Sequence, residues 1–595
     1  MKGAFRSATA WSYMGLIAIA LAAPAVLPQY PLFVLSLAIV NIVAVLGVNL
    51  TMGYAGQISL GHAGFTALGA YATALLMVHG EWSFWMALPA SGLIAGAVGY
   101  LLAFPALRLG PLYVSMVTFG FGMAVVLILQ NWYELANGPN GMAVPSPQFF
   151  GSLLDPDRFH FAIVIVAAVL FLVTRNILDA RLGRAFVALR ESEVAARAMG
   201  INLAAAKTTA FGLGAAYGGI AGSLFAGLTQ FVNPDAFVFG VSITYVTMAI
   251  LGGSGFFVGP IIGGLTLTVI PELLRGAAEY KELLTGFILL TLLTFLPRGV
   301  VGLLSDLSPL RTRAPENLQA VGTPPKEERT SRVSNHSGAD LLSVENVSLS
   351  FGGLAALKNI SFAVREDEIV SIIGPNGAGK TSVFNTISGF YRPDSGIIHF
   401  DGQSLLDYAA HRRASMGISR TFQNLELFPD MSVLDNVLVG THTQLRNSGI
   451  ESALRLSAER QREHEQRLRA SALLDFVGLR EYALERAGNL SFGHQRLLEI
   501  ARALASRPKL LMLDEPAAGL NSAEMAALTR IIRLARSEYG TSVLLIAHTM
   551  SLVMDLSDRI IVLHHGEKIA EGNPETIQRN QTVIDAYLGE AAEHA

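Results

Sequence analysis

The chain has 595 residues, of which 51% are hydrophobic and only 15% are charged. This length exceeds that of one ordinary domain, and soluble domains carry about a quarter of charged residues. The net charge of −3 gives no basis for a nucleic-acid partner. The absence of cysteine excludes disulfides, thiolate metal sites and cysteine nucleophiles.

The N-terminus has two interpretations. Lys2 and Arg6 precede an apolar stretch that ends in Ala-Leu-Ala-Ala-Pro-Ala, residues 20–25, a pattern that resembles a signal peptide with its cleavage site. A first membrane span is favoured, because the apolar run is long enough to cross a bilayer and further apolar runs follow at once.

Uncharged runs follow one another through residues 1–304 and predict a polytopic, all-α membrane domain. A helix needs about 20 apolar residues to cross the hydrocarbon core, and soluble proteins do not contain so many such runs. About ten spans are expected, of which the one at 239–252 is short enough to cross only halfway. The runs lie near residues 11–28, 31–50, 59–79, 84–105, 111–131, 159–174, 208–229, 239–252, 256–274 and 283–296.

Basic residues cluster between the sixth and seventh runs. The cluster comprises Arg175, Arg181, Arg184, Arg190, Arg197 and Lys207. The loop at 134–157 is poor in Lys and Arg, so the positive-inside rule predicts that the Arg-rich loop is cytoplasmic. An even number of spans then places both termini on the cytoplasmic side.

Two membrane segments, residues 53–64 and 212–227, are rich in small residues and predict close helix packing. Gln57 and His62 are polar at membrane depth, where polar side chains face a cavity or another helix. Both interpretations stay open for His62: a residue lining a transport pathway, or a packed histidine with its hydrogen bonds satisfied.

Residues 193–201 of the Arg-rich loop predict a short helix that ends at Gly200, since alanine favours helix and glycine ends it.

Beyond the membrane domain, residues 305–340 are polar, contain several prolines and lack apolar periodicity. They predict a flexible tether. Residues 341–595 have the composition of a soluble α/β domain.

Residues 374–381, Gly-Pro-Asn-Gly-Ala-Gly-Lys-Thr, form a complete phosphate-binding loop. The loop lies between an apolar strand, residues 369–373, and a helix that begins near Lys380, which is the context that the motif requires. Backbone N–H groups would surround the phosphates, Lys380 would reach the β- and γ-oxygens, and Thr381 would bind Mg²⁺. The expected ATP contacts in this segment are Gly374, Asn376, Gly377, Gly379, Lys380, Thr381 and Ser382.

A second acidic element follows the apolar strand at 510–513. Asp514 would hold Mg²⁺, and Glu515 would polarise the attacking water. His548 ends a further apolar strand, where it could contact the γ-phosphate. Glu515 and His548 are therefore the predicted catalytic residues.

Residues 490–496, Leu-Ser-Phe-Gly-His-Gln-Arg, resemble the signature of ABC ATPases, with Phe492 and His494 as departures. In that family Ser491 and Gly493 contact the γ-phosphate bound by the opposite subunit. Gln423 matches the glutamine loop, a ligand of the metal and water, and Phe351 is a candidate for stacking on adenine or for the core.

The chain as a whole resembles a fused permease and ATPase of the branched-chain amino acid ABC importer family. The residues that carry this resemblance are 53–63, 118–122, 190–201, 251–255, 259–260, 351–353, 489–493, 517–521 and 586–590. The loop with Glu193, Ala196 and Gly200 resembles the importer loop that docks on the ATPase. Its match is partial, because Val194 occupies the usual glutamate position.

The resemblance implies an ABC ATPase fold for residues 341–595, with ATP and Mg²⁺ as ligands. It also implies a second permease and a second ATPase, or a second copy of this chain, and a periplasmic or extracellular solute-binding protein. The location would be the bacterial inner membrane, with a cytoplasmic ATPase. Leucine, isoleucine and valine are the expected substrates, with urea, short amides and aromatic acids as alternatives. An ABC exporter half-transporter and a membrane-tethered signalling ATPase are weaker alternatives.

Overall fold

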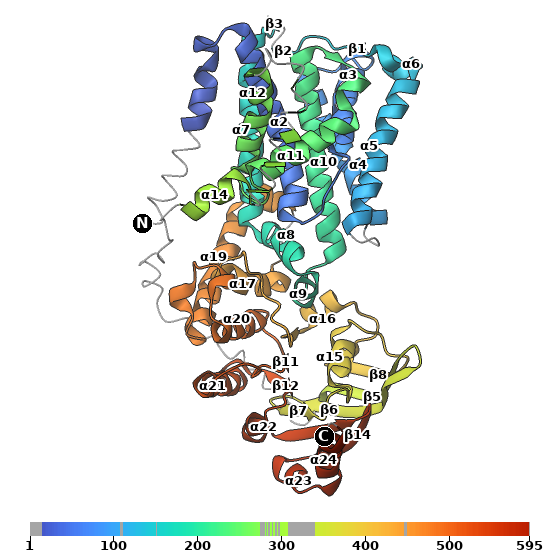
Figure 1. Cartoon of the computed structure of the whole chain (residues 1–595), viewed down its shortest axis with the longest axis vertical. Coiled ribbons are helices and arrows are strands. Elements are labelled where there is room, and N and C mark those ends of the chain that lie inside the picture. The colour runs from blue at the N-terminus through green and yellow to red at the C-terminus, as the bar shows by residue number, and fades with distance from the viewer. Residues whose placement is uncertain are drawn as a thin grey trace. The chain divides into compact units, whose positions relative to one another are not determined.

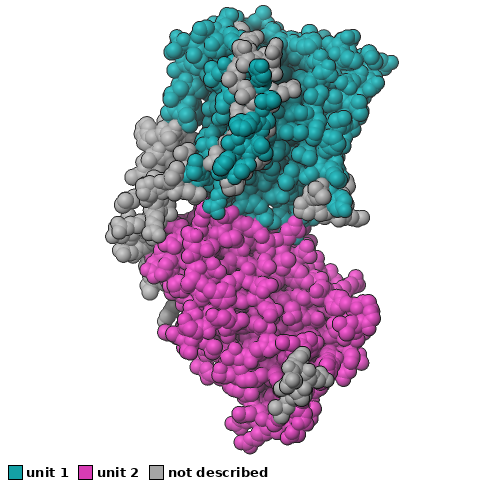
Figure 2. Space-filling model, in the orientation of Figure 1, with its two compact units in different colours: residues 1–190, 203–311, 449–454 teal, residues 191–202, 312–448, 455–595 magenta. Residues whose placement is uncertain are grey.

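The computed structural model describes residues 15–106, 111–149, 152–273, 280, 283, 286–287, 290–291, 294–295, 298–307, 340–445 and 449–593. The chain divides into two compact units (Figure 2). Unit 1 comprises residues 1–190, 203–311 and 449–454, and unit 2 comprises residues 191–202, 312–448 and 455–595. Most of the expected tether, residues 308–339, lies outside the described residues.

Unit 1 is built from apolar helices (Figure 1). Six of the described helices are long and apolar enough to cross a membrane, and three shorter apolar ones accompany them, so the expected count of about ten spans is not confirmed. Half of the tenth expected run, residues 283–296, lies outside the described residues. The helices are Gly15–Val26, α2 (Gln29–Val48) with its π-helical continuation η1 (Asn49–Tyr54), α3 (His62–Val78), α4 (Phe84–Ala106), α5 (Pro111–Asn131), α7 (Pro156–Asp179), α10 (Leu203–Thr229), α11 (Phe239–Gly252) and α12 (Gly259–Leu273).

Helix α10 lies among α2, α3 and α4, and its small residues bring the backbones together (Figure 1). A Cβ atom on Gly222 would lie 1.9 Å from the carbonyl oxygen of Thr66, and one on Gly69 would lie 2.0 Å from that of Gly219. Because no side chain fits at these distances, the tight packing predicted for residues 212–227 is confirmed.

Short elements connect these helices. Strand β1 pairs with β4 and strand β2 pairs with β3, both antiparallel. Helix α18 comes from the second half of the chain but belongs to unit 1, where it contacts α7. The bounds are α6 (Tyr133–Ala136), η2 (Gly138–Asn140), β1 (Met142–Ala143), β2 (Gln148–Phe149), β3 (Ser152–Leu153), α8 (Arg181–Glu191), β4 (Phe231–Val232), η3 (Pro234–Phe237), α14 (Gly299–Leu307) and α18 (Gly449–Leu454).

Unit 2 contains two sheets. The larger has the order β10-β11-β12-β7-β13-β14, in which only the β13–β14 pair is antiparallel. The other is antiparallel, with the order β6-β5-β8-β9. Strands β7, β11 and β12 are buried along their whole length, which is typical of a parallel sheet covered on both faces. The strands are β5 (Asp340–Phe351), β6 (Leu354–Arg365), β7 (Ile369–Ile373), β8 (Ser395–Phe400), β9 (Gln403–Ser404), β10 (Ile418–Arg420), β11 (Leu510–Asp514), β12 (Ser542–Ile546), β13 (Arg559–His564) and β14 (Glu567–Gly572).

Helices cover these sheets and form a helical subdomain around α17, α19 and α20, whose apolar faces share one core with β11 and β12. Helix α9, from the Arg-rich loop, belongs to unit 2. The helices are α9 (Glu193–Ala198), α15 (Lys380–Ser388), α16 (Ala410–Met416), α17 (Val433–Gly440), η6 (Thr441–Gln444), α19 (Ser457–Phe476), η7 (Arg480–Tyr482), η8 (Ala487–Asn489), α20 (Phe492–Ala505), α21 (Ser522–Tyr539), α22 (Met550–Leu556), α23 (Pro574–Gln578) and α24 (Gln581–Glu593).

Candidate functional site

The phosphate-binding loop joins the buried strand β7 to the N-terminus of α15. Lys380 is buried, and its Nζ donates to the carbonyl oxygens of Gly374 and Pro375, both at 2.7 Å. Gly379 has φ +99°, and a Cβ atom there would lie 2.7 Å from the carbonyl oxygen of Ala356. The loop therefore needs glycine to curl at the helix N-terminus, where backbone N–H groups favour an anion.

A cavity of about 320 Å³ lies beside this loop. The three residues predicted to bind the metal, Thr381, Gln423 and Asp514, all line it. Asp514 ends strand β11 and is 1% exposed, and burial raises the pKa of its carboxyl group. Its Oδ1 atom has no hydrogen-bond partner among the described residues. A buried, unpartnered carboxylate oxygen beside a threonine hydroxyl fits a magnesium site.

Arg420 is a site residue that the sequence interpretation missed. Its guanidinium donates to Asp514 Oδ2 at 2.9 Å and to Asn385 Oδ1 at 2.6 Å, and it lies over the rings of Phe384 and Phe422. The pairing fixes one oxygen of Asp514 and leaves Oδ1 for the cavity. An arginine in the fully buried strand β10 is the sequence signal that could have identified it, since buried arginine needs an acidic partner.

Three residues predicted from separate motifs meet at Glu515. His548 Nε2 lies 3.1 Å from Glu515 Oε1, and Gln423 Nε2 donates to Glu515 Oε2 at 3.2 Å. Glu515 itself has φ +48°, and its N–H donates to the carbonyl oxygen of Ile546 at 2.8 Å. The carboxylate is thereby held at the end of strand β11, next to Asp514.

The signature residues lie elsewhere in the domain. Ser491 caps α20 by accepting the N–H of His494 at 3.4 Å, and a Cβ atom on Gly493 would lie 2.1 Å from Glu524 Oε1. Neither residue lines the cavity beside the phosphate-binding loop. Phe351 is 46% exposed and packs edge-on against Tyr391, with ring centroids 5.0 Å apart, so it is available to a ligand rather than part of the core.

A buried ionic network on α20 holds the segment that contains Gln423. Glu499 accepts the N–H of Phe422 at 3.1 Å and pairs with Arg496 at 3.1 Å. Arg496 in turn donates to the carbonyl oxygens of Phe422, at 2.7 Å, and of Gln423. Arg502 donates to the carbonyl oxygen of Glu426 at 2.6 Å. The helix that follows the signature thus fixes the backbone of residues 422–426.

Helix α9 packs on the same segment. Ser192 Oγ donates to Glu426 Oε2 at 2.5 Å, and the Arg197 guanidinium lies 5.8 Å from the ring centroid of Phe390. Ala196 is fully buried, and Gly200 ends the helix with φ +83°. Val194 lines the cavity described above, whereas Glu193 is exposed. The expected short helix closing on glycine is present, and its neighbour Ser192 provides the polar contact.

The two polar residues predicted in the membrane half lie in unit 1. His62 is 1% exposed, stands edge-on to Phe65 and Tyr245 at centroid distances of 6.1 Å, and its Nε2 atom has no partner in the described part of the chain. The side-chain nitrogen of Gln57 is also buried and unpartnered there. The His62 side chain is thus packed among aromatic rings, with one ring nitrogen unpartnered among the described residues.

Three family models match the chain. The model described as branched-chain amino acid transport system / permease component matches residues 30–293. The model described as ABC transporter matches residues 357–518, and that described as branched-chain amino acid ATP-binding cassette transporter matches residues 567–593.

Similar proteins match each half. The high-affinity branched-chain amino acid transport ATP-binding protein BraF of Pseudomonas aeruginosa is 46% identical over 251 residues, 42% of this chain and 98% of BraF. The corresponding permease protein LivM of Escherichia coli is 35% identical over 333 residues, 52% of this chain and 78% of LivM. A solved nucleotide-free ATP-binding cassette from an ABC transporter is 30% identical, covers 42% of this chain and 99% of its own, and has a TM-score of 0.37.

Proposed function

We propose that this chain, which belongs to the branched-chain amino acid ABC transporter family and joins a permease to an ATPase, imports branched-chain amino acids across the bacterial inner membrane. Relatives of both halves are named for the transport of these substrates. The observation that carries the proposal is the arrangement in unit 2, where the cavity beside the phosphate-binding loop is lined by Asp514, Gln423 and Val194 of the importer-type loop.

The nucleotide site supports ATP hydrolysis. On binding of ATP, Lys380 would exchange the carbonyl oxygens of Gly374 and Pro375 for phosphate oxygens. Thr381, Gln423 and Asp514 would hold Mg²⁺, which when bound neutralises charge on the β- and γ-phosphates. Glu515, held between Gln423 and His548, is placed to orient and polarise the attacking water.

The site is completed by another subunit in this proposal. Ser491 and Gly493 do not line the cavity that contains Thr381, which supports a role for them at the phosphate bound by a second ATPase. That second ATPase and a second permease come from another copy of this chain or from related subunits. Closure of the two ATPases over ATP would bring each signature onto the opposite phosphate.

Helix α9 would transmit this closure. Its N-cap residue Ser192 contacts Glu426, and the backbone carbonyl of Glu426 is held by Arg502 of the signature helix. A displacement of the signature helix or of Gln423 would therefore move the surface on which α9 packs. Helix α9 is joined to the candidate membrane span α10 by residues 199–202 only, so a displacement of α9 would be passed on to the permease.

The orientation in the membrane determines on which side the amino acid is delivered. The Arg-rich loop and the ATPase are cytoplasmic, in agreement with the positive-inside rule. A solute-binding protein on the opposite side delivers the amino acid and provides most of the selectivity. The unpartnered Nε2 atom of His62 supports a place for this residue on the transport pathway, together with Gln57.

Uptake of labelled leucine by proteoliposomes that contain the assembled transporter and its binding protein tests the proposal. Glu515→Gln is expected to keep ATP binding and to lower hydrolysis and uptake together by about 10²-fold or more, because the attacking water loses its base. Glu538→Gln, an exposed position on α21, is the matched control and is expected to behave as the wild type.

Two results would contradict the proposal. Normal hydrolysis by the Glu515→Gln variant would refute the catalytic assignment. Uptake of leucine that is outcompeted by urea or by phenylalanine, but not by isoleucine or valine, would refute the substrate.

A further inference from the structure

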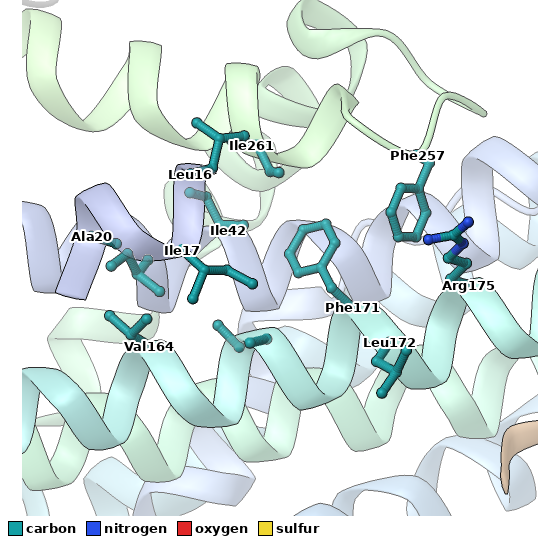
Figure 3. A pocket seen from close by; sticks show the side chains of 13 residues that line it. Leu16, Ile17, Ala20, Ile42, Val164, Phe171, Leu172, Arg175, Phe257 and Ile261 are labelled. Carbon is teal, nitrogen blue, oxygen red and sulfur yellow. The ribbon is translucent and has the colours of Figure 1, made fainter. Parts of the chain in front are cut away.

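Unit 1 contains an apolar cavity between helix Gly15–Val26, α2, α7 and the start of α12 (Figure 3). Its volume is about 220 Å³. Leu16, Ile17 and Leu172 on its wall are also exposed, so the cavity opens at the surface of the described part of unit 1. The residues that line it are Leu16, Ile17, Ala20, Ile39, Ile42, Val164, Ala167, Ala168, Phe171, Leu172, Arg175, Phe257 and Ile261.

Arg175 is the one charged or polar side chain among these lining residues. It lies near the C-terminal end of α7, and Figure 3 shows its guanidinium beside Phe257 at one end of the cavity. It makes no hydrogen bond or ion pair with any residue that the structure describes. The rings of Phe171 and Phe257 pack edge-on next to it, with centroids 5.4 Å apart.

The chemistry of this wall excludes the transported amino acid as the occupant. A free amino acid carries an ammonium group, and no carboxylate or other acceptor side chain is present among the lining residues to receive it. A long apolar slot with a single cation at one end is instead complementary to an acyl chain joined to an anionic headgroup.

We infer that this cavity binds one anionic phospholipid, with an acyl chain between helix Gly15–Val26 and α7 and the phosphate paired with Arg175. The phosphate would then lie in the cytoplasmic leaflet under the orientation proposed above, because Arg175 is the first residue of the basic cluster at 175–207. Guanidinium pairs with phosphate in a bidentate manner, which gives an arginine at this place an advantage over lysine.

The position of Arg175 is stabilised independently of a ligand. Asn176, the next residue of α7, donates through Nδ2 to the carbonyl oxygen of Ala453 in α18 at 2.9 Å, within unit 1. This contact holds the end of α7, so the guanidinium is presented at a fixed end of the slot. Binding of lipid there would bridge α7 to the first described helix and to Phe257.

Native mass spectrometry of the full chain in detergent tests the inference, with added phosphatidylglycerol as the probe. The wild type is expected to retain one lipid per chain at the lowest lipid concentration. Arg175→Gln is expected to weaken this binding roughly fivefold or more, the effect of one interfacial cation on an anionic lipid. Ala168→Phe, which fills the slot without a change of charge, is expected to abolish it.

Arg158→Gln is the matched control, because Arg158 is exposed at the opposite end of the same helix. Equal loss of lipid in Arg158→Gln and Arg175→Gln would indicate general charge attraction and overturn the inference. So would unchanged binding in Ala168→Phe, an absence of bound lipid in the wild type, or displacement of the lipid by inorganic phosphate. Equal binding of phosphatidylcholine would overturn the requirement for an anionic headgroup. The measurement needs neither ATP nor substrate, so its failure is distinguishable from a failure of the transport proposal.

Discussion

Asp514 and Thr381 are ordinary residues whose surroundings make them suitable for a metal. Asp514 is paired with Arg420 through one oxygen and leaves the other unpartnered among the described residues. The Thr381 hydroxyl makes no hydrogen bond to the residues described and lies on the wall of the same cavity. In the proposed metal site, these two oxygens would bind Mg²⁺ without the loss of a hydrogen bond to the described residues.

Replacement of Thr381 by valine tests this arrangement with little risk to the fold, because the side chain is exposed. The affinity for Mg²⁺ in the presence of ATP is expected to fall at least about 10-fold, since loss of even an outer-shell partner costs that much. Titration of ATP hydrolysis with Mg²⁺ measures the effect. Thr582→Val, at an exposed position on α24, is the control, and an unchanged Mg²⁺ requirement in Thr381→Val would refute the ligand assignment.

Glu499 is the carboxylate partner of two buried arginines, and its removal should lower the stability of the domain. Glu499→Ala leaves Arg496 and Arg502, which are 3% and 0% exposed, without their carboxylate. Breaking a buried pair costs about 3–5 kcal/mol, which corresponds to a fall of roughly 6–20 °C in the unfolding temperature of a domain of this size.

Thermal unfolding of the full chain in detergent, followed in the absence of nucleotide, measures this loss. Asp555→Ala is the comparison, because it removes the exposed pair with Arg533, and such pairs contribute less than about 1 kcal/mol. Similar unfolding temperatures for the two variants would show that the network on α20 does not stabilise the domain.

Among the elements, α9 packs closely against its neighbours in unit 2, through small side chains and Gly200. Its buried alanines allow the helix to approach, and its end at Gly200 has a backbone conformation that side chains disfavour. A Cβ atom on Gly200 would also lie 2.3 Å from Thr443 Cγ2. Helix α9 is therefore sensitive to the addition of a single methyl group.

Gly200→Ala is expected to uncouple the transporter: leucine uptake should fall by about 10-fold or more while basal ATP hydrolysis is retained, because misplacement of a contact by about 1 Å can cost that much. Gly478→Ala is the control: it places alanine at a similar positive φ, +78°, but in open space. It therefore adds backbone strain without a steric clash. Loss of coupling in both variants, or in neither, would contradict the role of α9. Parallel assays of uptake and hydrolysis in proteoliposomes decide the outcome.

On the scale of the whole molecule, Ser491 does not line the cavity beside Lys380. One subunit should therefore bind ATP through Lys380, and the Ser491 of another subunit should be needed for its hydrolysis. Ser491→Ala should leave the affinity of the isolated chain for ATP unchanged and lower hydrolysis by the assembled transporter by about 10²-fold, the effect of losing one donor to a transition-state oxygen. Lys380→Ala should instead abolish binding by the isolated chain.

Equilibrium binding of a fluorescent ATP analogue and steady-state hydrolysis measure the two quantities. Co-expression of the two variants distinguishes the partners: recovery of hydrolysis in the mixture indicates two copies of this chain, and its absence indicates related subunits. Weakened ATP binding by the isolated Ser491→Ala chain would contradict the composite site.

Local patterns in the sequence predicted much of this protein. The phosphate-binding loop, the acidic pair at Asp514, the apolar runs and the helix ending at Gly200 each depend on neighbours within about ten residues, so a linear pattern is sufficient to identify them. The family followed from the same patterns, and the comparisons show it. The expected count of about ten spans is not confirmed among the described residues, because apolar runs alone do not separate helices that cross a membrane from shorter ones.

Only the tertiary structure decided which distant residues meet. Arg420 reaches Asp514 across 94 positions, Arg496 reaches the Gln423 backbone across 73, and Ser192 reaches Glu426 across 234. The slot around Arg175 likewise combines helices from both ends of the membrane half. Such contacts depend on how strands and helices pack in three dimensions, and no local pattern records that packing.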